Sequence, residues 1–338
     1  MAVNVLLVLA GLVVLGWGAD VFVVSAARVS VTRGLSPVVI GAVVVGFGTG
    51  VPELLVSASA AARGSVDIAA GNVIGSNLAN LTLVLGVAGL IARPETVPRV
   101  LRREAPLSFA SVLLFAVVVQ GGLTRPEGVL LLAALVVVVA LMLRATEPVP
   151  VDVLATAEAA TAEAAAVEAL VDEVEEFVEE EGEDTLADVA ASARPDVLRA
   201  ALGLAATVAG AQLLVAGASA IADDVGLSGG FVGLTIVALG TSLPELVTAV
   251  QSARRDETAL LIGNVLGSNV FNSTAVAGTA ALIGPGEITD AGLTVTAAGS
   301  MVLVAALAWL FLGLGGRLRR WEAVVLLVVY AATLPLSA

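Results

Sequence analysis

Long apolar segments recur along the whole chain, and they restrict its fold more than any other feature does. Each is close to the roughly 20 residues that a helix needs to cross about 30 Å of hydrocarbon. Because 58% of the 338 residues are hydrophobic, too little polar sequence remains to cover a soluble fold. The sequence predicts an all-α polytopic membrane protein. Its ten transmembrane helices are expected at residues 3–25, 35–62, 67–92, 105–122, 126–143, 198–221, 229–253, 258–284, 289–313 and 321–337.

Three residue types are absent, which excludes several classes of chemistry. Without cysteine, the chain has no disulfides, thiol catalysis or cysteine-ligated metals. Without histidine, it lacks the usual zinc ligand and the usual proton carrier at neutral pH. Lysine is absent too, so all sixteen basic residues are arginine. We expect neither an enzyme nor a resident cofactor.

The arginines indicate how the chain crosses the membrane. Positive residues collect in cytoplasmic loops, and with the N-terminus outside, fourteen of the sixteen arginines fall on the inner side. Arg63 and Arg125 fall outside. The sequence therefore predicts a multi-pass protein of the cell membrane, with both termini outside and the loop 148–195 in the cytoplasm. The first segment lacks the basic start of a signal peptide and is interpreted as a transmembrane helix.

Acidic residues gather in one segment between the apolar helices. Residues 152–188 hold fourteen acidic residues and no basic one, so they account for the whole net charge of −14. Blocks of like charge are usually solvated, and this one lacks the ligand spacing of an EF-hand. A calcium-sensing or partner-binding role stays open, but the sequence favours a linker. It divides the chain into a first five-helix half, 1–147, the acidic linker 148–195 and a second five-helix half, 196–338.

The two halves contain related sequences. Residues 18–91 align with 210–283 at a constant offset of 192, and 29 of the 74 aligned positions are identical. The first matched block is GFGTGVPELL with ALGTSLPELV, and the second is GNVIGSNLANLT with GNVLGSNVFNST. Since each half has an odd number of spans, the second copy enters the membrane upside down. Two inverted five-helix repeats place a substrate site near the middle of the membrane, where the halves meet.

One glutamate of each repeat lies within an apolar span. A carboxylate at Glu53 or Glu245 costs at least about 2.5–3.5 kcal/mol on insertion scales, and neither span contains an arginine. Pro52 and Pro244, directly before them, remove a helical N–H and break the helix. Irregular backbone at membrane depth is tolerated only where it is buried in protein or lines a cavity. The sequence therefore predicts that both glutamates contribute to one cation site.

Neutral oxygen ligands accompany each glutamate. Ser76 and Asn80, like Ser268 and Asn272, are four residues apart and share a helix face. Carboxylate, hydroxyl, amide and carbonyl oxygens suit hard cations, and Ca²⁺ accepts irregular shells of about 6–8 oxygens more readily than Mg²⁺ does. Further amides, which could bind a cation or cap the helix breaks, are Asn72, Asn77, Asn264 and Asn269.

A third intramembrane acid, Asp20, differs from the two glutamates because its repeat mate is Gln212. We expect it near the inner end of the first helix, with its carboxylate reaching water. This position favours an interfacial role over a role in the cation site.

The two repeated blocks resemble the alpha-repeats of the calcium/cation antiporter superfamily, in its sodium/calcium-exchanger branch. The resemblance covers both repeats and the ten-helix plan, and it implies exchange of about three Na⁺ for one Ca²⁺ by alternating access. It also implies that the first and sixth helices slide over the remaining helices. The ion ligands it implies are Thr49, Glu53, Ser76 and Asn80 of the first repeat and Thr241, Ser242, Glu245, Ser268 and Asn272 of the second, with the backbone oxygens of Gly46 and Ala238.

Two positions depart from the family pattern. The family usually has Thr-Ser in both repeats, whereas the first copy here is Thr49-Gly50. One hydroxyl ligand of the family pattern is therefore missing, and one of the sodium positions that the resemblance implies lacks a ligand. Some members carry an acid where Asn272 stands, so the site here has two formal negative charges, which balance one Ca²⁺ but not three Na⁺.

Other classes of protein fit the sequence less well. A Ca²⁺/H⁺ antiporter or a K⁺-dependent Na⁺/Ca²⁺ antiporter on the same fold stays open. An ion channel would also bury carboxylates, but channels usually build pores from rings of subunits. An intramembrane protease is a poor fit because this chain has no second intramembrane aspartate near Asp20. We expect Ca²⁺ and Na⁺ as substrates and membrane lipid as the surroundings, with no nucleic acid and no obligate protein partner.

Overall fold

The computed structural model describes residues 2–32, 37–96, 98–144, 194–224, 238–290, 292–314 and 316–333. Within them the chain forms helices, and the only β pairings are two isolated bridges, Glu95 with Arg317 and Leu123 with Gly286. Each of the ten predicted apolar segments contains helix. The all-α prediction is confirmed. Residues 148–193 of the predicted linker lie outside the described residues, so the proposed division of the chain remains a prediction.

The first half contains broken and irregular helices as well as straight ones. Its elements are α1 (Ala2–Thr32), α2 (Pro37–Ile40), η1 (Gly41–Val45), α3 (Gly46–Thr49), α4 (Val51–Ala62), α5 (Val66–Ala79), η2 (Asn80–Val84), α6 (Leu85–Ala92), α7 (Pro98–Arg102), α8 (Glu104–Val118), η3 (Val119–Gly121) and α9 (Arg125–Leu143).

The second half repeats much of this order. Its elements are α13 (Arg194–Asp224), α15 (Ala238–Thr241), α16 (Leu243–Arg254), α17 (Thr258–Phe271), η5 (Asn272–Val276), α18 (Ala277–Ile283), η6 (Gly292–Ala297), α19 (Ala298–Gly313) and α20 (Arg320–Thr333). α13 is the counterpart of α1, α15 and α16 correspond to α3 and α4, and the run α17–η5–α18 corresponds to α5–η2–α6.

The helices are suited to a lipid environment. Five helices of the described chain are long and apolar enough to cross a membrane singly, and the pair formed by α2–α3 and α4 passes the same test with a 45° bend between its parts. Large apolar side chains lie on the outside, including Val13, Val136, Val295 and Leu303, each at least 68% exposed. Apolar surface of this extent belongs in a bilayer. The protein is a multi-pass membrane protein.

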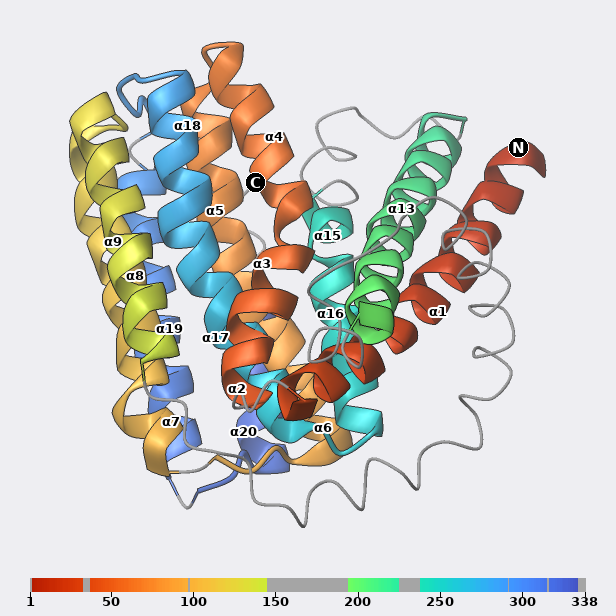
Figure 1. Ribbon diagram of the computed structural model, residues 1–338. Coiled ribbons are helices and arrows are strands. Elements are labelled where there is room, and N and C mark those ends of the chain that lie inside the picture. The colour runs from red at the N-terminus through yellow and green to blue at the C-terminus, as the bar shows by residue number, and fades with distance from the viewer. Residues whose placement is uncertain are drawn as a thin grey trace, which may run out of the picture.

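α1 and α13 form a two-helix unit at one flank of the molecule. Figure 1 shows them side by side and tilted relative to α8, α9 and α19 on the opposite flank. Small residues allow close contact along the pair, as at Gly210, where an added Cβ would lie 2.4 Å from the Leu15 backbone nitrogen. Near one end Asp196 of α13 pairs with Arg28 of α1 at 3.8 Å. The two helices therefore pack as one close pair.

α17 lies at the centre of the core. It is buried from Leu260 to Phe271 and contacts η1, α2, α3 and α8. Its motif glycines explain the contact with the first repeat, because a Cβ on Gly267 would lie 2.0 Å from the Ala42 carbonyl oxygen. Only glycine lets the two backbones approach so closely. The second-repeat motif thus presses against the broken helix of the first repeat.

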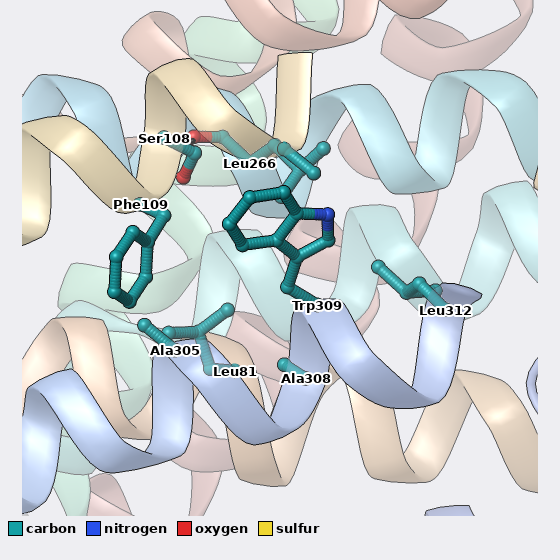
Figure 2. A pocket seen from close by; sticks show the side chains of 9 residues that line it. Leu81, Ser108, Phe109, Leu266, Ala305, Ala308, Trp309 and Leu312 are labelled. Atoms are coloured by element: carbon teal, nitrogen blue, oxygen red, sulfur yellow. Dashed lines mark hydrogen bonds between the residues drawn. The ribbon is translucent and has the colours of Figure 1, made fainter. Parts of the chain in front are cut away.

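A small, separate apolar pocket lies between α8, α19, η2 and α17 (Figure 2). Phe109 and Trp309 stand on its wall, with their ring centroids 5.6 Å apart. Its polar groups are already engaged: the Ser108 hydroxyl donates to the Leu266 carbonyl oxygen at 3.0 Å, and the Trp309 indole N–H to the Leu101 carbonyl oxygen at 3.2 Å. The described residues that line it include no carboxylate, so this pocket is unsuited to a cation.

Candidate cation site

Each repeat has a helix break directly before its glutamate. Between α3 and α4, Gly50 has φ −76° and ψ 0°, and between α15 and α16, Ser242 has φ −89° and ψ 5°. The following proline stands in the first turn of the new helix, where its missing N–H is tolerated. Glu53 and Glu245 lie in the same first turns. The predicted breaks are confirmed, and each carboxylate sits near the positive end of a helix dipole.

The two breaks meet across the repeats. The Ser242 hydroxyl of the second repeat donates to Glu53 Oε1 of the first at 3.3 Å. Both glutamates are 1% exposed, and among the described residues neither Glu53 Oε2 nor either carboxylate oxygen of Glu245 has a hydrogen-bond partner. A buried carboxylate is expensive unless it is paired or binds a cation. The geometry therefore leaves three carboxylate oxygens available for a cation.

The two motif asparagines begin π-helical turns. η2 starts at Asn80 and η5 starts at Asn272, at equivalent places in the repeats. Both side chains are fully buried or nearly so, and none of their four amide atoms has a hydrogen-bond partner in the described structure. Single π turns inside α-helices are frequent at functional sites. Each π turn places a free amide oxygen in the interior.

The hydroxyl groups of the first repeat are buried beside the break. Thr49 is fully buried and donates to the Val45 carbonyl oxygen at 3.0 Å, which leaves its oxygen lone pairs able to accept a cation. Ser76, 4% exposed, lies on α5 one turn before Asn80.

The second repeat supplies Thr241, 4% exposed, at the end of α15, and Ser268, fully buried, on α17. The Ser268 hydroxyl lies 3.3 Å from the Gly46 carbonyl oxygen of the first repeat and 3.4 Å from Asn264 Oδ1. The Gly46 carbonyl, which the resemblance implies as a ligand, therefore lies against a serine of the other repeat. Ala238, its counterpart, is the first residue of α15.

Two of the four ambiguous asparagines brace the broken helices. Asn72 donates to the Glu53 carbonyl oxygen at 3.3 Å and to the Ser57 hydroxyl at 2.9 Å, which ties α5 to α4. Asn264 donates to the Thr248 hydroxyl at 3.1 Å, which ties α17 to α16. These bonds agree with the capping alternative. Sequence reasoning missed Ser57 and Thr248, whose only signal is a place one helical turn after each glutamate.

Asn77 makes its hydrogen bonds across the two halves of the chain. Its amide donates to the Ser273 hydroxyl at 2.9 Å and to Met301 Sδ at 3.4 Å, so it joins α5 to η5 and α19. Its repeat mate Asn269 is fully buried, and its amide atoms have no partner among the described residues.

Asp20 is held outside this site, at a partly exposed position. Its side chain is 34% exposed and forms an ion pair with Arg255, at the C-terminal end of α16. The predicted interfacial position fits this geometry, although the sequence did not indicate the partner.

The donor set as a whole suits a hard cation. Within the described residues, no three acidic, histidine or cysteine side chains come together as a metal cluster. The site thus offers two carboxylates with hydroxyl, amide and carbonyl oxygens around them, the set that Ca²⁺ and Na⁺ prefer.

Two related halves of membrane helices, each broken beside a buried carboxylate, define a secondary transporter. The family model described as sodium/calcium exchanger protein matches residues 3–144 and 197–337. The chain belongs to this family of cation antiporters.

Relatives match over nearly the whole chain. CaxA of Alkalimonas amylolytica is 35% identical over 98% of this chain and 97% of its own length. The sodium/calcium exchanger MaX1 of Methanosarcina acetivorans is 32% identical over 98% of this chain and 97% of its own. The solved structure of the sodium-calcium exchanger NCX_Mj superposes with a TM-score of 0.81 at 26% identity, covering 99% of both chains. The fold and branch predicted from the repeated motifs are confirmed.

Proposed function

We propose that the protein exchanges Na⁺ for Ca²⁺ across the cell membrane by alternating access, with the cations bound between Glu53 and Glu245. The observation that carries this proposal is the meeting of two equivalent helix breaks, each with a buried carboxylate, in the Ser242–Glu53 contact of 3.3 Å. The two carboxylates balance one Ca²⁺ in charge. Family membership and the exchanger activity in the name of MaX1 support Na⁺ and Ca²⁺ as the cations.

The neutral ligands complete the proposed shell. The Asn80 and Asn272 amide oxygens have no competing hydrogen bond in the described structure. The Gly46 carbonyl and the hydroxyls of Ser76 and Ser268 lie on the helices that cross at the breaks. Oxygens that are already buried and oriented replace the water that a cation loses on entry. We assign the same role to Thr49, Thr241, Ser242 and the Ala238 carbonyl.

The α1–α13 unit is the candidate moving part. It contacts α2, α3, α15 and α16, the elements that carry or precede the breaks. Its small-residue seam makes it a single body, and sliding of this body past the breaks would expose the cations to one side of the membrane and then to the other. We propose the orientation given by the arginines, with both termini outside and the acidic linker in the cytoplasm.

Ion flux into proteoliposomes tests the function. Vesicles loaded with Na⁺ and diluted into Na⁺-free medium containing Ca²⁺ should accumulate Ca²⁺, and collapsing the Na⁺ gradient should stop the uptake. Parallel vesicles receive a K⁺ or a pH gradient alone. Uptake driven by the pH gradient without Na⁺ would replace the proposal with Ca²⁺/H⁺ antiport. A requirement for K⁺ together with Na⁺ would make K⁺ a third transported ion.

A further inference from the structure

The two repeats differ at one pair of positions beside the cation site. In the second repeat Ser242 stands at the helix break, and its mate in the first repeat is Gly50. A second pair of repeat mates also differs in size. Ala79, at the end of α5, is matched by the much larger Phe271, at the end of α17. Position 271 therefore has a large side chain, and position 50 has none.

The Phe271 ring occupies the space beside Gly50. A Cβ added at Gly50 would lie 2.6 Å from Cδ1 and 3.0 Å from Cε1 of this ring, and the next nearest atom is the Gly46 carbonyl oxygen at 3.2 Å. The ring is 9% exposed and packs against Phe47 with centroids 4.9 Å apart at 36°. This stacking holds the ring in place, so the side chain of a serine at position 50 would collide with it.

Because of this difference, the two glutamates do not have equivalent hydroxyl neighbours. Ser242 gives Glu53 a hydroxyl at 3.3 Å. By the symmetry of the repeats, the matching hydroxyl for Glu245 would come from position 50, where glycine supplies none. The Thr49 hydroxyl lies near Glu245, but its proton goes to the Val45 carbonyl oxygen at 3.0 Å. One half of the site thus has a hydroxyl where the other half has an aromatic ring.

We propose that Phe271 is a specificity-determining residue, whose ring excludes an oxygen ligand from the first-repeat half of the site and weakens Na⁺ binding relative to Ca²⁺. Na⁺ carries one charge and depends more on the number of neutral oxygens around it, whereas Ca²⁺ is held chiefly by the two carboxylates. The loss of one hydroxyl position therefore lowers Na⁺ affinity more than Ca²⁺ affinity. This inference rests on the proposed exchange of Na⁺ for Ca²⁺ at this site.

Binding to the purified protein in detergent tests the proposal separately from transport. Radiolabelled Ca²⁺ is bound and then displaced by Na⁺ in the parent protein, Gly50→Ser, Phe271→Ala and the double variant. We expect the double variant to need several-fold less Na⁺ for half displacement. Gly50→Ser alone should gain little because its side chain meets the ring, and Phe271→Ala alone should gain nothing because it adds no oxygen.

The matched control is Gly50→Ser with Val270→Ala, which removes a neighbouring buried side chain of α17 but leaves both the Phe271 ring and its stacking partner Phe47. An equal gain in this control, an equal gain in Gly50→Ser alone, or no gain in the double variant would overturn the proposal. Absence of Ca²⁺ binding in all the proteins would overturn it as well. If the variants that carry Phe271→Ala do not fold, Gly50→Ser with Phe271→Leu takes their place under the same criteria. Normal binding without Na⁺-driven uptake into vesicles would instead contradict the proposed exchange.

Discussion

The guanidinium of Arg255 holds the carboxylate of Asp20 with two hydrogen bonds of 2.7 Å, from Nε to Oδ1 and from Nη2 to Oδ2. Asp20 lies on α1, and Arg255 caps the C-terminal end of α16, the helix whose first turn holds Glu245. The ion pair therefore joins the α1–α13 unit to the helix of the second glutamate. If this unit slides during transport, the pair must break.

Removing the ion pair should speed exchange. A partly exposed pair contributes up to about 1 kcal/mol, which corresponds to about a fivefold change in rate. Because Asp20→Asn removes up to about this much stabilisation of the resting conformation, we expect it to raise the rate of Ca²⁺ exchange in vesicles by roughly two- to fivefold. Ca²⁺ affinity in detergent should be unchanged. The double variant Asp20→Arg/Arg255→Asp should return the rate toward the parent value. Arg254→Gln, which removes a neighbouring exposed arginine, is the control, and an equal acceleration there would show a general effect of charge.

Glu53→Gln and Glu245→Gln should each abolish Ca²⁺ transport. Each substitution preserves the shape of the side chain and removes one of the two charges that balance Ca²⁺. Without cations, the variants should melt at a higher temperature than the parent, because a buried unpaired charge has been removed. Ca²⁺ at 100 times its dissociation constant should stabilise the parent by about 2.7 kcal/mol and should not stabilise the variants. Normal transport in both variants would contradict the site.

The sequence predicted the parts of this fold that depend on local composition. The length of the apolar segments predicted the helices, and Pro52 and Pro244 predicted the breaks. It did not predict the π turns at Asn80 and Asn272, because nothing in their composition distinguishes a π turn from an α turn.

Contacts between distant residues were also beyond the sequence. Asp20 and Arg255 are 235 residues apart, and only the packing of α1 against α16 brings them together. Phe271 looks like an ordinary apolar residue within a polar motif. Asn72 and Asn80 are of one residue type, but Asn72 bonds to α4 whereas Asn80 begins η2 and has no partner in the described structure, a difference that only the packing determines.

The close crossing of α17 and η1 should be sensitive to a single methyl group. Gly267→Ala would place a Cβ 2.0 Å from the Ala42 backbone oxygen, and neither backbone can give way easily. We expect a loss of at least about 1–3 kcal/mol, as for other overpacked cores, seen as a lower melting temperature in detergent. Gly299→Ala on α19 is the control, since its Cβ would meet nothing within 4 Å. A parent-like melting temperature for Gly267→Ala would contradict the crossing.

The acidic linker should be dispensable for exchange. Residues 152–188 lie outside both repeats and lack a cation-ligand spacing. Replacing them with a neutral Gly/Ser linker of the same length should preserve the rate and Ca²⁺ dependence of exchange in vesicles. Loss of activity in a protein that still binds Ca²⁺ in detergent would indicate a regulatory segment instead.

Protons should compete with Ca²⁺ for the site without being transported. A proton on Glu53 or Glu245 removes part of the charge that attracts Ca²⁺, so a proton and Ca²⁺ exclude each other at the same carboxylates. Apparent Ca²⁺ affinity should therefore fall as the pH is lowered, and a high Ca²⁺ concentration should restore the maximal rate.

The measurement is Ca²⁺ uptake at a fixed Na⁺ gradient, with the pH set equal on both sides of the vesicle membrane. Competition raises the Ca²⁺ concentration for half-maximal uptake at low pH and leaves the maximal rate unchanged. The Asp20→Asn variant, which alters an acid outside the site, should show the same shift as the parent. A fall in the maximal rate that Ca²⁺ does not reverse would mean that protons act elsewhere in the protein, because occupancy of the site by Ca²⁺ excludes a proton from the same carboxylates.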